Sequence, residues 1–205
     1  MYHMESKYLM KKNNLKKHID AYLEEIHNVL KIAKNDRVLL NLIENIVFEL
    51  SQALSKGKKI IMSGNGGSAA DAQHIVAEFI CRFKKDRVSL PAISLNSDVS
   101  VLTSIANDYG YENIFSRQIE SLANEGDIYW TFSTSGKSKN VIKSLQLAKS
   151  LNIKCIGFTG SNNSTMEEYC DYLVEVPSKM TCHIQEMHII LAHLICDLVE
   201  QDFAE

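Results

Sequence analysis

The alternation of short apolar segments with amphipathic helical ones restricts the fold of this chain more than any other feature of its sequence. Five apolar segments have the length and composition of strands, and helical patterns fill the intervals between them. They are residues 59–62, 92–95, 128–132, 155–158 and 172–176. Strands that alternate with helices form parallel sheets, because each crossover helix covers one face of the sheet. The sequence therefore predicts an α/β fold, with a doubly wound, mostly parallel five-stranded sheet flanked by helices.

Two long helical patterns precede the first strand. In the first, apolar residues recur at spacings of three and four and so share one face; they are Leu15, Ile19, Tyr22, Leu23, Ile26 and Leu30. The second begins near Asn35 or Asp36, either of which can cap it, and stops at Gly57, which suits the left-handed residue after a helix. Two such apolar faces need a surface to cover them. We therefore expect residues 14–56 to form an N-terminal arm of oligomerisation helices.

The composition argues against several classes of protein. The chain has 205 residues with only 2 prolines and 9 glycines, and neither a repeat nor a linker divides it, so residues 1–205 are expected to form a single domain. A net charge of −3 provides no broad positive field, which argues against nucleic acid as a partner. No stretch approaches about eighteen consecutive apolar residues, so no membrane association is expected.

The number and spacing of the cysteines indicate a reducing cellular compartment. There are five, at positions 81, 155, 170, 182 and 196, and no two of them form a C-x-x-C pair. An odd number with this spacing suggests neither a disulfide framework nor a structural zinc site. The first residues also lack the apolar region of a secretory signal. A cytoplasmic localisation is the expectation.

Two turns rich in glycine or hydroxyl groups follow predicted strands and lead into helices. The first is Gly64-Asn65-Gly66-Gly67-Ser68, whose backbone N–H groups can approach an anion at the positive end of the helix dipole. The second is Ser133-Thr134-Ser135-Gly136-Lys137-Ser138, which adds several hydroxyls to such N–H groups. Its composition and position indicate a phosphate site. The alternative is that Ser138 or a neighbour only caps the following helix.

The helix expected at about residues 69–83 carries a row of ionisable side chains. His74 and Glu78 are four positions apart and project from one face, and Arg82 extends the row by another turn. Considered alone, such a row is more often a surface ion pair than a site. Because it begins just beyond a glycine turn at a strand end, a functional role is favoured.

The last helical pattern carries His183, His188 and His193. Its apolar stripe consists of Ile184, Met187, Leu191, Leu194 and Leu198. Histidine on an apolar helix is more often a packed residue than a ligand, and His188 is interpreted in that way because it neighbours the stripe. For His183 both interpretations stay open.

Further motifs complete the pattern and point to a family. They are Asp71-Ala72-x-His74-x-x-x-Glu78, Asn107-Asp108-x-Gly110, Ile114-Phe115-Ser116-Arg117 and Ile184-Gln185-Glu186-x-His188. Each is modest alone, but together with the two turns, in this order and spacing, they are highly specific. The chain resembles the sugar isomerase (SIS) domain family, and within it the phosphoheptose isomerases, over roughly residues 14–200. The resemblance implies a flavodoxin-like three-layer sandwich.

The resemblance also implies an activity. It is the aldose–ketose isomerisation of sedoheptulose 7-phosphate to D-glycero-D-manno-heptose 7-phosphate, the first step of nucleotide-activated heptose synthesis for lipopolysaccharide or capsule. In the family, the positions of Glu78 and His193 are the acid–base pair, and those of His74, Glu78, Gln185 and His193 bind one zinc ion per subunit. The family forms homotetramers with active sites between subunits.

The substrate positions of the family are carried over residue by residue. Ser133, Thr134, Ser135 and Ser138 correspond to the phosphate site, and Asn65, Gly66, Gly67, Ser68, Glu78, Arg82, Asn107, Asp108 and Gln185 to the rest of the substrate site. Cys182 stands where many relatives have an acidic residue, and Ala69-Ala70 stand where relatives often carry a histidine. Neither change removes a member of the acid–base pair.

The implied zinc site places a demand on geometry. Gln185 and His193 are eight positions apart, which is about 12 Å along a helix at a rise of 1.5 Å per residue. Both reach one ion only if the side chains lean together, if the helix starts after Gln185, or if the ligands come from different chains.

A second functional hypothesis is a binding protein without catalytic activity. It would resemble the tetrameric SIS-domain protein that binds the bacterial replication initiator, which keeps the fold and much of the phosphate loop. Fold alone does not fix function, so the discriminating feature is the set of catalytic positions. His74, Glu78, Gln185 and His193 are all present in this chain, which favours the enzyme.

Overall fold

The computed structural model describes residues 12–161 and 164–204, and the remaining residues of the span 1–205 lie outside the described part. The strands are β1 (Ile60–Gly64), β2 (Ala92–Ser94), β3 (Ile128–Phe132), β4 (Lys154–Gly160) and β5 (Tyr172–Val176). The helices are α1 (Lys12–Asn35), α2 (Arg37–Ser55), α3 (Gly67–Ile80), α4 (Val99–Tyr109), α5 (Ser116–Leu122), α6 (Lys139–Ser150) and α7 (Thr181–Gln201). Two 3₁₀ turns, η2 (Tyr111–Asn113) and η3 (Thr165–Glu168), complete the described elements.

The five strands form one parallel sheet in the order β2-β1-β3-β4-β5. From β1 the next strand, β2, is added on one side of the sheet, whereas β3, β4 and β5 follow in order on the other side. The direction of winding therefore reverses between the neighbours β1 and β3. Ligands of such sheets bind beyond the carboxyl ends of the strands at this reversal. The predicted doubly wound α/β fold is confirmed.

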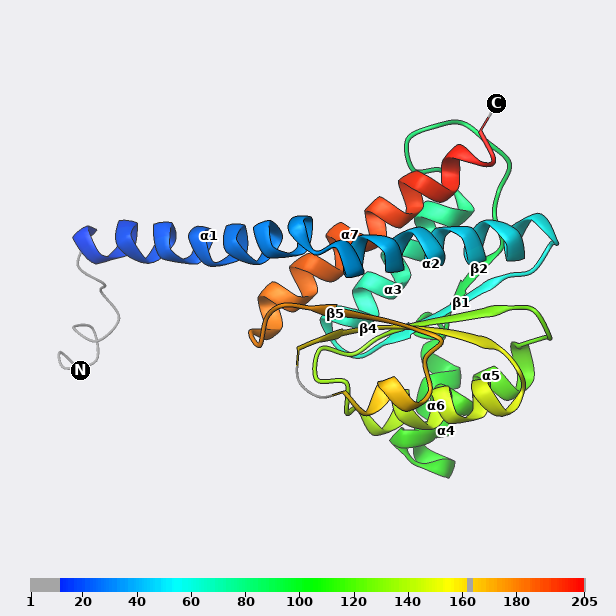
Figure 1. Cartoon of the computed structure of the whole chain (residues 1–205). Coiled ribbons are helices and arrows are strands. Elements are labelled where there is room, and N and C mark those ends of the chain that lie inside the picture. The colour runs from blue at the N-terminus through cyan, green and yellow to red at the C-terminus, as the bar shows by residue number, and fades with distance from the viewer. Residues whose placement is uncertain (1–11, 162–163, 205) are drawn as a thin grey trace.

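Helices cover both faces of the sheet, as Figure 1 shows. One face packs Ile60, Trp130 and Phe158 against α2, α3 and α7, and the other packs Ile61 and Tyr129 against α5 and α6. Successive residues of β1 and β3 therefore contribute to opposite cores, as the period of a strand requires. Strands β1 and β3 are buried along their whole length, which is why they read as continuous apolar runs.

In the N-terminal arm, α2 begins at one of the two caps that the sequence predicts, and much of the apolar face of α1 is exposed to solvent. Asp36 caps α2, because its carboxylate accepts hydrogen bonds from the Val38 and Leu39 N–H groups. Only the C-terminal part of α1 is buried, through Val29 and Ala33. Much of the predicted stripe is exposed: the exposed fractions are 46% for Leu15, 49% for Ile19, 58% for Leu23 and 41% for Leu30. In Figure 1 this part of α1 projects away from the sheet. Its role in assembly stays a prediction.

Within the described residues, two helices are long and apolar enough to cross a membrane when judged by length and composition alone. They are α2 and α7, with a mean hydropathy of 1.2 each. Leu39, Ile46 and Leu50 of α2 and Met187 and Ile195 of α7 are instead buried in the core beside the sheet. Half of the apolar segment of α7 is buried in this way, against 28% of the apolar segment of α2, where Val38 and Phe48 stay exposed.

Helix α3 is shorter at its end than the sequence predicts, so Arg82 does not continue the row of His74 and Glu78 on the helix. The helix ends at Ile80, and residues 81–87 are irregular. The buried carboxylate of Glu200 accepts hydrogen bonds from the N–H groups of Phe83, Lys84 and Lys85 at 2.7–2.8 Å. A side chain from α7 thus satisfies backbone groups that would otherwise favour another helical turn.

Candidate active site

The glycine turn after β1 presents unoccupied backbone donors. Gly66 stands at the N-cap of α3 with φ of 57° and ψ of −122°, and no side chain caps the helix there. The N–H groups of Ser68 and Ala69 donate to the carbonyls of Asn65 and Gly66, so the N–H groups of Gly66 and Gly67 are the ones left to meet a ligand at the positive end of the helix dipole. A Cβ at Gly67 would lie 2.6 Å from Nε2 of Gln185, so the absence of a side chain lets α7 approach the turn. The structure therefore brings Gln185 to Gly67.

The hydroxyl loop, residues 133–138, lies at the end of the neighbouring strand β3. Ser138 occupies the N-cap of α6, but its side chain makes no capping hydrogen bond. Its hydroxyl lies 3.1 Å from that of Ser133 instead. Gly136 has φ of 62°, and a Cβ there would lie 2.1 Å from Oγ of Ser164. Because Ser138 does not cap through its side chain, the helix-cap interpretation does not account for the loop.

A direct contact joins the two turns. Asn65 and Asn140 exchange two side-chain hydrogen bonds of 2.9 Å, each amide nitrogen donating to the other amide oxygen. The Tyr111 hydroxyl also donates to Oδ1 of Asn65 at 3.0 Å. Neither Asn140 nor Tyr111 was predicted from the sequence. Both precede or follow recognisable motifs, but only their packing against the glycine turn identifies them.

The side chains of three predicted residues lie close together where α3 packs against α7. Nε2 of His74 lies 3.1 Å from Oε1 of Glu78 and 3.4 Å from Nε2 of His193. Burial and the nearby His74 imidazole hold the pKa of His193 below its ordinary value, although Glu78 opposes them. These effects favour the neutral form of the His193 imidazole. The Phe83 ring lies 5.2 Å from the ring of His193 and partly covers it.

This trio has the geometry of a metal site. One ligand atom from each of His74, Glu78 and His193 lies within 4.8 Å of the others. Ligand atoms at 2.0–2.1 Å from a tetrahedral zinc ion are roughly 3.3 Å apart, close to the two distances above. Two imidazole nitrogens and a carboxylate oxygen are also a donor set that zinc accepts. The residues fit a transition-metal ion.

The other predicted residues are distributed around these groups. Asn107 and Asp108 are exposed near the end of α4, where the Asn107 amide donates to the Asp108 carboxylate at 2.7 Å. Ser68 is buried in the first turn of α3, and Arg82 is exposed in the irregular segment beyond it. The side chain of Gln185 lies against Gly67. Its role as a metal ligand stays a prediction.

The other two histidines of α7 make different contacts. His188 is fully buried between the rings of Phe132 and Phe158, and burial lowers its pKa to about 4. This confirms the interpretation of His188 as a packed residue. His183 lies 2.9 Å from Glu186 and 3.2 Å from Glu25, so it joins α7 to α1.

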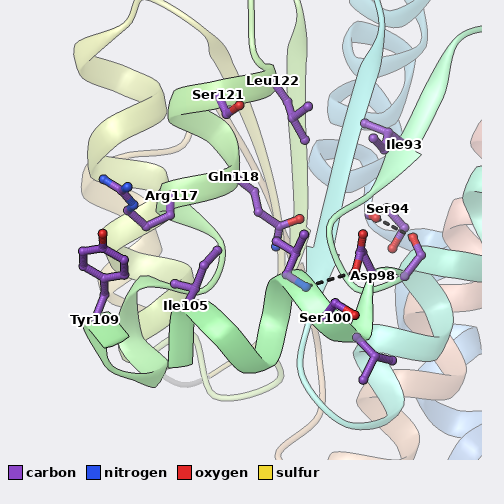
Figure 2. Close-up of a pocket in the computed structure, with 13 residues that line it drawn as sticks. Ile93, Ser94, Asp98, Ser100, Ile105, Tyr109, Arg117, Gln118, Ser121 and Leu122 are labelled. Carbon is purple, nitrogen blue, oxygen red and sulfur yellow. Dashed lines mark hydrogen bonds between the residues drawn. The ribbon is translucent and has the colours of Figure 1, made fainter. Parts of the chain in front are cut away.

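A separate hollow of about 730 Å³ lies between α4, α5 and the edge strand β2 (Figure 2). It contains none of the residues predicted for the site. Arg117 lies at its rim with the guanidinium 4.5 Å from the Tyr109 ring centroid, and Gln118 lies deeper inside. The Arg117 motif therefore contributes to this hollow, whereas the trio and the two turns lie elsewhere.

A parallel sheet wound in this order, with a hydroxyl loop and a glycine turn at its carboxyl edge, has the architecture of a sugar isomerase domain. The chain belongs to the SIS domain family, whose model matches residues 21–160. It is 46% identical to the phosphoheptose isomerase of Aneurinibacillus thermoaerophilus over 184 residues, which cover 90% of this chain and 93% of the relative. It is also 46% identical to the phosphoheptose isomerase of Burkholderia pseudomallei over 183 residues, covering 89% and 93%.

Solved structures of the same kind agree. The phosphoheptose isomerase of Francisella tularensis superimposes with a TM-score of 0.87 at 32% identity, covering 92% of this chain and 98% of that one. The enzyme of Neisseria gonorrhoeae gives a TM-score of 0.84 at 35% identity, covering 91% and 99%. The similarity thus extends to almost the whole length of these isomerases.

Proposed function

We propose that this chain is an aldose–ketose isomerase that converts sedoheptulose 7-phosphate to D-glycero-D-manno-heptose 7-phosphate. The observation that carries the proposal is the trio of His74 and Glu78, on the helix that begins at the glycine turn, with His193 of α7. Relatives named phosphoheptose isomerase at 46% identity over most of the chain support the same conclusion. They do not favour the alternative of a binding protein without catalytic activity.

The substrate would lie along α3 from the two turns to the trio. Ser133, Thr134, Ser135 and Ser138 would hold the phosphate, and Asn65, Gly66, Gly67, Ser68, Arg82, Asn107, Asp108 and Gln185 would contact the rest of the sugar phosphate. Gly67 and His74 are seven residues apart, or about 10 Å along a helix. A ketose phosphate carries its carbonyl near the opposite end of the chain from its phosphate. This separation suits a long open-chain sugar.

The reaction moves a carbonyl from C2 to C1 by proton transfer. A base removes a proton from C1, the resulting enediolate is stabilised, and an acid returns a proton to C2 while the oxygen-bound proton moves from O1 to O2. Glu78 and His193 would be the acid–base pair. Burial and the His74 imidazole hold the pKa of His193 below its ordinary value, which favours the neutral form of its imidazole.

The proposed metal is zinc, one ion per subunit, held by His74, Glu78 and His193 with Gln185 as a fourth ligand. When bound, zinc would polarise the carbonyl and neighbouring hydroxyl of the sugar. A carboxylate that ligates a metal loses basicity, so Glu78 cannot serve both roles fully at one time. The test below therefore separates ligation from proton transfer.

The proposed assembly is a homotetramer with active sites between subunits. The exposed apolar residues of α1, among them Leu15, Ile19 and Leu23, are the surface that subunits would cover. We place the enzyme in the cytoplasm, with no nucleic acid or membrane partner. Its product would enter nucleotide-activated heptose synthesis for lipopolysaccharide or capsule.

Purified protein incubated with sedoheptulose 7-phosphate tests the activity. NMR should detect aldose heptose phosphate, and no conversion with or without added zinc would refute the proposal. Glu78→Gln and His193→Gln should each lower kcat by at least about 100-fold, as expected for a lost acid–base group. Loss of turnover with metal retained would assign that residue to proton transfer, and joint loss would assign it to ligation. Ser150→Ala, on the far end of α6, is the control and should match wild type.

A further inference from the structure

We propose that Asn140 is a positioning residue, which holds the glycine turn and the hydroxyl loop at a fixed separation through the side chain of Asn65. Asn140 lies two residues after Ser138 and is only 3% exposed, so it is not available to a substrate. It nevertheless reaches across the reversal point of the sheet, from the first turn of α6 to the turn that follows β1. This inference rests on the proposed function and deepens it.

The contact is fixed in one orientation. The Val141 N–H donates to Oδ1 of Asn140 at 3.0 Å, and a backbone N–H can only donate, so this atom must be the oxygen. The amide nitrogen of Asn140 then faces Oδ1 of Asn65. On the other side, the Asn65 amide nitrogen donates back to Asn140 Oδ1. The pair is reciprocal, and neither amide can rotate without breaking both bonds.

The side chain of Asn65 is consequently occupied. Its oxygen accepts from both Asn140 and Tyr111, and its nitrogen donates to Asn140, which leaves one N–H for any ligand. The sequence assigns Asn65 to direct sugar contact. The geometry instead assigns the Asn65 side chain to contacts with Asn140 and Tyr111. These three residues, which we call the clamp, connect the two turns. The neighbouring Gly66 and Gly67 remain exposed to meet the sugar through the backbone.

The clamp should affect the binding only of ligands that contact both the glycine turn and the hydroxyl loop. A sugar phosphate bound by the hydroxyl loop and the glycine turn requires the correct distance between them, and a misplacement of about 1 Å can cost on the order of 100-fold in rate. On the proposed function, inorganic phosphate would occupy the hydroxyl loop alone. Loss of the clamp should therefore weaken the sugar phosphate and leave inorganic phosphate nearly unchanged, whereas unfolding of the loop would weaken both.

A double-mutant cycle on Asn65→Ala and Asn140→Ala tests the proposal. Each single variant should lower kcat/KM by about 10- to 100-fold, and the double variant should be within about threefold of the worse single one, because both substitutions remove the same contact. Calorimetry on Asn140→Ala should give a dissociation constant for inorganic phosphate within about twofold of wild type. Losses that multiply in the double variant, wild-type kcat/KM in Asn140→Ala, or loss of phosphate binding would overturn the clamp.

Two further measurements keep the result unambiguous. If Asn140→Ala does not fold, the cycle uses Asn140→Asp, which keeps the size and the acceptor but removes the donor to Asn65. Gln146→Glu is its control, because it makes the same amide-to-acid change on the exposed face of α6. If wild type does not isomerise sedoheptulose 7-phosphate, the proposed function fails, and the cycle is measured on the dissociation constant of that sugar phosphate. Additive losses there, or no binding, would overturn the clamp as well.

Discussion

Replacing Gly136 by alanine should damage the hydroxyl loop far more than an ordinary glycine substitution. Gly136 has φ of 62°, a left-handed conformation that costs an L-residue about 1–2 kcal/mol. The new Cβ would also lie 2.1 Å from Oγ of Ser164 and 2.8 Å from Oγ1 of Thr159. Ser164 cannot move freely, because its hydroxyl accepts a hydrogen bond from the Met166 N–H at 3.1 Å. Overpacking of this kind costs about 1–3 kcal/mol.

The two contributions together correspond to about 2–5 kcal/mol of unfolding free energy. For a chain of this size each kcal/mol lowers Tm by about 2–4 °C, so a decrease on the order of 10 °C is expected in calorimetry. The KM for sugar phosphate should rise as well, because the loop must shift to relieve the clash.

Gly57→Ala is the matched control. Gly57 has a similar φ of 70°, but a Cβ there has no heavy atom within 4 Å. Only the backbone cost of about 1–2 kcal/mol should appear, with KM unchanged. Equal decreases in Tm for the two variants would show that the clash with Ser164 is absent, and the description of the loop as tightly packed would be wrong.

Two other predictions follow from individual contacts. Ser138→Ala should lower the free energy of unfolding by about as much as Ser133→Ala, because each removes the hydrogen bond between these two hydroxyls and the Ser138 side chain does not cap α6. Ser138→Ala should also raise KM for sugar phosphate, whereas Asp36→Ala, which removes a cap from α2, should cost about 1 kcal/mol and leave KM unchanged. Chemical denaturation and steady-state kinetics on the three variants test this, and a stability loss for Ser138→Ala well above that for Ser133→Ala would restore the cap interpretation. The hydrogen bond from His183 to Glu186 raises the pKa of His183 despite burial, with Glu25 adding to the effect, so its stabilisation is fully present below the ordinary histidine pKa of about 6.5 and is lost as pH rises through the raised value. The Tm difference between wild type and His183→Gln should therefore shrink as the pH is increased from 6 towards 9, and a constant difference would contradict the assignment.

Local features of the fold were determined by the sequence alone. The five strands and a helix cap at Asn35 or Asp36 follow from short-range rules of periodicity and capping, and so does the helix end before Gly57; the structure decides for Asp36. The hydroxyl loop could be located for the same reason, since a strand end and a helix start fix its position. His74 and Glu78 could be paired because four residues on a helix place two side chains on one face.

What the tertiary structure decided depends on residues far apart in the chain. Helix α3 ends at Ile80 because Glu200, which is 117 positions beyond Phe83, binds the backbone that follows the helix. His193 meets His74 across 119 positions, and Asn140 meets Asn65 across 75. Periodicity along one segment carries no information about which side chain of another segment faces it, because that depends on how the helices pack over the sheet. The site is therefore composed of locally predictable parts whose contacts exist only in the folded chain.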